Sequence, residues 1–95
     1  PPTLTFRVEV IKSQKPLKTE QLDIIRRLAG NRGLDILTNP SGQSIYLIGK
    51  FLTFESAAEY ADLLIRNGQK ESKVTAYLGI REIPVETARQ LFEKF

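Results

Sequence analysis

Alternation of apolar and polar residues marks the first predicted element. Over residues 4–11 every second residue, beginning with Leu4, is apolar, and threonine, arginine and glutamate occupy the positions between them. Period-two alternation with β-branched and aromatic residues is typical of a strand that is buried on one face. The polar segment 12–18 contains Pro16 and predicts a loop.

Helical spacing follows this loop. Apolar residues at positions 22, 25, 28 and 29 fall on one stripe, which predicts a helix over residues 19–30. We expect Thr19 to be its N-cap and Gly30 or Gly33 to end it. A short second strand is predicted over 34–38, and the Asn-Pro-Ser-Gly sequence at 39–42 predicts a hairpin turn.

The second half of the chain repeats this order of elements. Residues 44–51 are apolar on both sides, which predicts a central strand. Thr53 is the expected cap of the next helix, which the Asn-Gly pair at 67–68 ends. Alternation over 73–78 predicts a fourth strand, and Pro84 marks the start of a last amphipathic helix.

The element order predicts an α+β domain of the ferredoxin-like β-α-β-β-α-β type. Its four-stranded antiparallel sheet would carry two helices on one face, with a C-terminal helix in addition. We expect residues 1–95 to form a single domain, with a core over about 4–83 and the last helix over about 84–95. That helix would either dock on the open sheet face around Ile11 and Leu47 or extend into a linker.

The amino-acid composition excludes several kinds of catalytic and cross-linking chemistry. The chain contains neither cysteine nor histidine, which excludes disulfides, thiolate chemistry and the commonest general base. Its net charge of +3 favours anionic partners only slightly. No cofactor, metal or membrane insertion by this domain is predicted. The chain begins Pro-Pro-Thr and lacks methionine, so we expect it to be part of a larger protein.

The second half carries a recognisable pattern of a strand, Gly-x-Phe, a hydroxyl residue and an alanine-rich helix that ends at glycine. This pattern resembles the half-repeat of SPOR (sporulation-related repeat) domains, a bacterial module that binds peptidoglycan. The matching residues are Gly49, Lys50, Phe51, Thr53, Ala57, Leu64, Gly68 and Val74.

The first half fits the opening Tyr-x-Val-Gln-Val-Gly pattern of that family less closely. Phe6, Val8 and Val10 agree with it, whereas Glu9 replaces the glutamine and Ile11 replaces the glycine. The resemblance covers roughly residues 4–83.

The resemblance implies a non-catalytic module of a periplasmic cell-envelope protein. Family members bind glycan strands stripped of stem peptides through the open sheet face and adjoining loops, with polar side chains for hydroxyls and apolar surface for sugar rings. An alternative is a SPOR-like fold that has lost glycan binding and serves as a spacer or docks another envelope protein. Alternation along the strands and the first loop give these candidate glycan-binding residues: Arg7, Glu9, Lys12, Ser13, Gln14, Thr75 and Tyr77.

Those polar residues have a simpler interpretation as the solvated side of an amphipathic sheet. Ile45 and Leu47 should share their face, which makes it more apolar than a sugar site usually requires. An apolar open face would also suit a small-molecule regulatory domain or a dimerisation module of the same topology.

Nucleic-acid binding and catalysis have less support. The aromatic run of an RNA-recognition motif is absent, and the basic residues are scattered among acids. Glu55, Glu59 and Asp62 lie along one helix without a partner base and fit a solvated helix surface. The Gly-Asn-Arg-Gly sequence at 30–33 follows a helix, whereas a phosphate-binding loop follows a strand. We therefore expect neither a nucleic-acid partner nor an enzyme.

Overall fold

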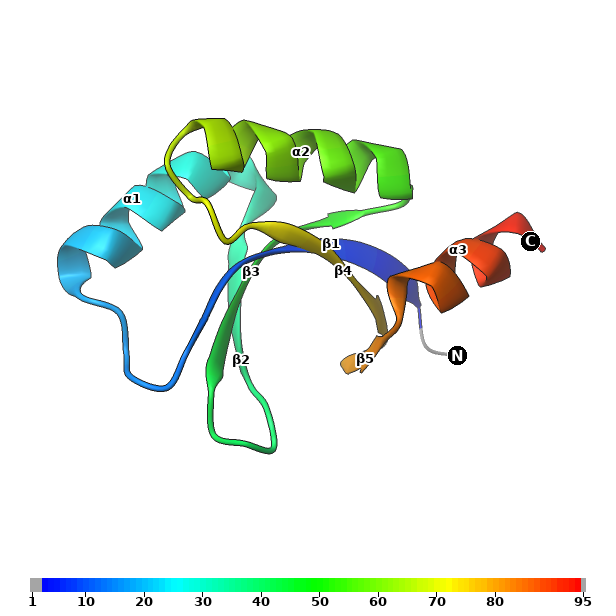
Figure 1. Cartoon of the computed structure of the whole chain (residues 1–95), viewed down its shortest axis with the longest axis horizontal. Helices are drawn as coiled ribbons and strands as arrows, with labels where there is room; N and C mark the ends of the chain where they lie inside the picture. Colours follow the sequence, from blue (N-terminus) through cyan, green and yellow to red (C-terminus); the bar gives the residue numbers. More distant parts are fainter. Residues whose placement is uncertain (1–2, 95) are drawn as a thin grey trace.

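A curled antiparallel sheet and three α-helices make up the computed structural model, which describes residues 3–94 (Figure 1). The α+β class is therefore as predicted. The elements in chain order are β1 (Leu4–Ser13), α1 (Thr19–Ala29), the 3₁₀ turn η1 (Gly30–Arg32), β2 (Leu34–Thr38), β3 (Ser44–Phe51), α2 (Phe54–Arg66), β4 (Lys73–Leu78), β5 (Arg81–Ile83) and α3 (Val85–Glu93).

The sheet has five strands in the order β2-β3-β1-β4-β5, with every neighbouring pair antiparallel. The predicted sheet of four strands is wrong in number, because β5 pairs with β4 through a turn at Gly79, whose φ is 66°. Three residues are too few for alternation to be read from the sequence. β1 also extends to Ser13, into the predicted loop.

The main hydrophobic core lies between the sheet and the two helices α1 and α2, which Figure 1 shows on the same side of it. Phe6, Val8 and Ile48 from the sheet are at most 1% exposed. Thr53 caps α2 as predicted, since its Oγ1 accepts a hydrogen bond from the backbone N–H of Ser56 at 3.1 Å. Thr19 is not the cap of α1: the helix begins at Thr19, and Lys18 precedes it in extended backbone.

The C-terminal helix α3 packs on the same side of the sheet as α2. Its Ala88 is fully buried in the main core, and the guanidinium of Arg89 lies 4.3 Å from the centre of the Phe54 ring in α2. The sequence suggests two other positions for this helix, over the open sheet face or in a linker. Neither occurs, because Ala88 of α3 is buried in the main core, although Phe92 of the same helix stays 47% exposed.

Two irregularities in the pairing of β1 with β3 set which side chains share a face. Gly49, with φ 71°, adds one residue to β3 between the Phe6–Phe51 and Val8–Ile48 pairs. A second shift follows Glu9 in β1 and turns Ile11 toward the main core, whereas the sequence pattern predicts it on the opposite face. Such bulges increase local twist and thereby curl the sheet.

The chain from residue 3 to residue 94 contains no helix with the length and hydropathy that crossing a bilayer would require.

Candidate functional site

The sheet face that α1 and α2 leave uncovered, here called the inner face, is mostly closed to solvent. Leu47 is fully buried and Ile45 is 4% exposed, and with Tyr77 they form a second, smaller core. The predicted binding residues Arg7, Glu9, Thr75 and Tyr77 lie on this face, between 2% and 7% exposed: Arg7 7%, Glu9 4%, Thr75 2% and Tyr77 2%. The interpretation of these four residues as a solvated surface is therefore wrong, because the curl of the sheet packs them against one another.

Arg7 ties three strands together from the centre of the sheet. Its Nε donates to the backbone carbonyl of Gly49 in β3, and one Nη donates to Asp35 Oδ2 of β2 at 2.7 Å. The Asp35 side chain is 53% exposed, whereas that of Arg7 is 8% exposed. The pair therefore lies where the inner face meets solvent, with the cation inside and the carboxylate outside.

Glu9 and Tyr77 are buried polar groups with incomplete hydrogen bonding among the described residues. Lys12 Nζ and Lys73 Nζ lie 3.9 and 3.8 Å from the two carboxylate oxygens of Glu9, and Oε1 of Glu9 has no hydrogen-bond partner. The hydroxyl of Tyr77 also has none. Burial, helped by the nearby Glu82 and Glu9 carboxylates, raises the pKa of Tyr77 to about 12.

The remaining predicted residues are not brought together with these. Lys12 is half-buried and points its ammonium at Glu9. Ser13, the last residue of β1, donates its hydroxyl to the carbonyl of Lys15 at 2.6 Å, and Gln14 is exposed beside it. The structure therefore gives the predicted set a buried part on the sheet and a separate exposed part on the loop.

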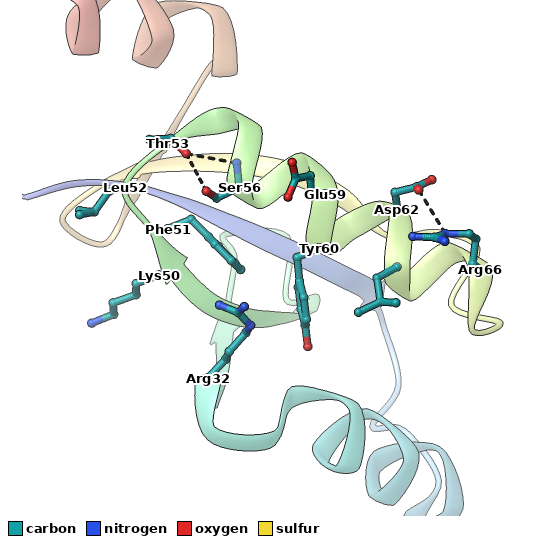
Figure 2. Close-up of a pocket in the computed structure, with 11 residues that line it drawn as sticks. Arg32, Lys50, Phe51, Leu52, Thr53, Ser56, Glu59, Tyr60, Asp62 and Arg66 are labelled. Carbon is teal, nitrogen blue, oxygen red and sulfur yellow. Dashed lines mark hydrogen bonds and ion pairs between the residues drawn. The ribbon is translucent and has the colours of Figure 1, made fainter.

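Another depression lies where the end of β3 meets α2 and η1. It is an open groove of about 870 Å³, within the range of small-molecule sites. Figure 2 shows Arg32 directed at the rings of Phe51 and Tyr60 along its floor, while Lys50 points outward at one end. Its lining residues are Arg32, Lys50, Phe51, Leu52, Thr53, Ser56, Glu59, Tyr60, Asp62, Leu63 and Arg66.

Arg32 is fixed in this groove by two aromatic rings. Its guanidinium carbon lies 4.9 Å from the centre of the Phe51 ring and 4.8 Å from that of Tyr60, which is cation–π distance. The Tyr60 hydroxyl donates to the carbonyl of Leu28 at 2.7 Å. Burial raises the pKa of Tyr60, and the positive charge of Arg32 acts in the opposite direction.

Sequence reasoning missed this groove because its residues come from three separate elements. The sequence places Arg32 in a turn, and Glu59 and Asp62 on a solvated helix surface. Asp62 does pair with Arg66 at 3.2 Å on the exposed side of α2. Only the SPOR-like pattern around 49–53 points to part of the groove, through Lys50, Phe51 and Thr53.

A second depression of about 410 Å³ continues the groove toward the inner face. The two share Arg32 and Lys50, and the second adds Arg7, Gly33, Asp35 and Gly49. Arg7 is thus the one predicted site residue that lines this depression. Within residues 3–94 no three histidine, cysteine, aspartate or glutamate side chains cluster as metal ligands would.

Comparisons with protein-family models, with curated proteins and with solved structures found no match to this chain. The residues and their geometry therefore carry the functional argument.

Proposed function

We propose that this domain is a non-catalytic module that binds peptidoglycan glycan strands as part of a periplasmic cell-envelope protein. The observation that carries the proposal is the groove between β3, η1 and α2, continued by the depression at Arg7. It combines apolar and aromatic side chains with hydroxyls and charged groups, the mixture that sugar rings and their substituents require. The groove is open to solvent, which suits a polymer that extends beyond the site.

The arrangement of the elements supports the same family of folds. We propose a ferredoxin-like core for this chain, in which β5 and α3 are additions at one edge. The order β2-β3-β1-β4 with antiparallel neighbours is the order that two interleaved β-α-β units produce. The bulge explains the glycine and the phenylalanine of the SPOR-like Gly-x-Phe motif, because Gly49 forms the bulge and Phe51 then lines the groove.

The groove is a better location for a glycan than the inner face. Most predicted residues on the inner face are buried too deeply to meet a sugar without rearrangement of the sheet. In contrast, Leu52 at the groove is 76% exposed. Catalysis is not proposed, because the chain has no histidine or cysteine and Asp62 is already paired with Arg66.

Cosedimentation with purified sacculi tests this function. Sacculi stripped of stem peptides by an amidase are compared with untreated sacculi, with excess RNA present to remove binding by charge alone. Preferential binding to stripped sacculi supports the proposal. Binding to neither form, with the circular dichroism spectrum of a folded domain, overturns it and leaves the docking of another envelope protein as the function.

Paired variants locate the site in the same assay. Leu52→Gln removes an exposed apolar side chain from the groove, and we expect weaker binding to stripped sacculi. Ile80→Gln is the matched control, since Ile80 is 90% exposed and lies in the turn before β5. Lys12→Gln reports on the loop end of the predicted inner-face site. If Lys12→Gln weakens binding to stripped sacculi and Leu52→Gln does not, the glycan site lies on the inner face and not in the groove.

A further inference from the structure

The two outer strands of the sheet differ in how their free edges are protected. β5 is three residues long, its Arg81 and Glu82 are exposed, and Pro84 follows it. Short length, charge and proline are the usual features that keep an outer strand from pairing with another chain. β2, at the other side of the sheet, is five residues long, contains neither lysine nor proline and pairs with β3 without a register shift. Its one charged residue, Asp35, is already paired with Arg7.

The backbone of β2 alternates between groups that bond to β3 and groups that point away from the sheet. Gly33, just before β2, accepts a hydrogen bond from the N–H of Gly49 at 3.2 Å. Asn39, just after β2, donates to the carbonyl of Gln43 at 3.0 Å. In an antiparallel ladder every second residue bonds to a given neighbour, so the even-numbered residues of β2 direct their N–H and C=O groups outward. Among residues 3–94 no strand pairs with this outer side.

This edge is complementary to itself. β2 is centred on Ile36, so a twofold axis at that residue aligns the whole strand with the β2 of a second copy. Ile36 then lies opposite Ile36, and Leu34 lies opposite Thr38. These are the residues with outward backbone groups, so the register allows about six hydrogen bonds between the two strands. On the other face Asp35 lies opposite Leu37, and like charges are not placed directly across from each other.

Ile36 supplies an apolar contact at the centre of this pairing. It is 47% exposed, whereas Leu34 on the same face of β2 packs against the main core. In the paired arrangement the two Ile36 side chains meet across the twofold axis and remove apolar surface from water. Cross-strand pairs of β-branched residues are among those that stabilise antiparallel sheets.

The hairpin that carries β2 is fixed before any pairing takes place. In its turn, Asn39 Oδ1 accepts hydrogen bonds from the backbone N–H groups of Ser41 and Gln43 at 3.1 and 2.9 Å. Arg7 of β1 holds Asp35 of β2 through the 2.7 Å hydrogen bond described above. A strand that is already extended and held in place loses little conformational entropy when it pairs.

We propose that two copies of this chain associate through their β2 strands and join two five-stranded sheets into one continuous antiparallel sheet. The inference concerns self-association and does not rest on the ligand of the groove. Strands of five residues make an interface below the size of stable complexes. We therefore expect a reversible dimer with a Kd of about 10 µM to 1 mM.

Sedimentation equilibrium up to about 2 mM protein measures the association, and amide hydrogen exchange at the same concentrations locates it. We expect protection of the amides of residues 34, 36 and 38 to rise with protein concentration. The amides of residues 35 and 37, which bond to β3 in each copy, should be protected throughout. A monomer at about 2 mM would overturn the proposal and leave the edge to an extended segment of another protein. Concentration-dependent protection confined to other elements would overturn β2 as the interface.

Charged variants of Ile36 test the twofold register. Ile36→Lys and Ile36→Glu each place like charges opposite one another across the axis, and each alone should raise the Kd by about tenfold or more. An equimolar mixture of the two places lysine opposite glutamate and should restore association. Ile80→Lys is the matched control, because Ile80 is 90% exposed in the turn before β5, and it should associate like the wild type.

Circular dichroism establishes that each variant is folded before its association is measured. Recovery in the mixture is specific to a contact in which residue 36 meets its own copy. Folded variants whose mixture stays monomeric would overturn the twofold register. An equal loss of association in Ile80→Lys would show that the added charge acts without regard to position and would overturn the assignment to β2.

Discussion

Replacement of Gly49 by alanine should destabilise the domain more than any other glycine substitution for which the space around a Cβ is known. Two separate costs add at this position. The backbone has φ 71°, a left-handed conformation that costs a residue with a Cβ about 1–2 kcal/mol. A Cβ at Gly49 would also lie 2.8 Å from Cε2 and 3.2 Å from Cζ of the Phe51 ring, closer than van der Waals contact allows.

The Phe51 ring has little freedom to move away from this methyl group. It is 5% exposed, its centre lies 5.6 Å from that of Tyr60, and the Arg32 guanidinium covers it. Overpacking at a fixed neighbour costs about 1–3 kcal/mol. The expected loss for Gly49→Ala is therefore about 2–5 kcal/mol, against a total stability of about 5–14 kcal/mol for a domain of this size.

Urea denaturation followed by circular dichroism measures this loss, with Gly42→Ala as the matched control. Gly42 has φ 81° but nothing within 4 Å of a built Cβ, so it carries the backbone cost without the clash. We expect Gly49→Ala to be the more destabilised by about 1–3 kcal/mol at an unchanged m-value. In a Phe51→Leu background the cost of Gly49→Ala should shrink. Equal losses for the two glycine variants, or an undiminished cost beside Leu at position 51, would refute the steric argument.

Two further predictions concern the inner face. Arg7→Met should lower the free energy of unfolding by about 2–4 kcal/mol, because it leaves the buried Gly49 carbonyl and Asp35 without their donor. Asp35→Asn should lower it by no more than about 1 kcal/mol, because the Asp35 side chain is half exposed. Similar losses for the two variants in urea denaturation would contradict this ordering. Tyr77→Phe removes a buried hydroxyl without a partner among the described residues, so stability at pH 7 should stay level or rise by up to about 1 kcal/mol. The pKa of Tyr77 is about 12 in the folded state and about 10 in the unfolded state. Its contribution to the free energy of unfolding is therefore fully present below pH 10 and is lost as the pH rises toward 12. The difference between wild type and Tyr77→Phe should therefore change across that interval, and a constant difference would show that Tyr77 is not protected from ionisation.

Local patterns were enough to place most of the secondary structure. Alternation in β1 and helical spacing in α2 reflect side chains that must face one core, and this requirement acts within a few residues. The cap at Thr53 and the end of α1 at Gly30 are also local, because a hydroxyl or a glycine changes the adjacent backbone directly. β5 could not be predicted in this way because its three residues contain too little of the alternating pattern.

The candidate site depended on contacts between distant segments. Alternation correctly placed Arg7 and Tyr77 on the face without α1 and α2, but it could not show that they are buried there. Arg32 gained its place over Phe51 and Tyr60 only when η1, β3 and α2 came together, and the sequence around Arg32 has no sign of this.

By itself, the sequence of this protein determined most of the strands and helices, β5 excepted, and which side chains share a face up to the second bulge of β1. The tertiary structure alone decided how strongly the sheet curls, where α3 packs, and which polar groups remain accessible. The physical reason is the sequence separation over which each interaction acts. Periodicity and capping are set by neighbours along the chain, whereas the bulge at Gly49 and the burial of Ala88 depend on residues brought together by folding.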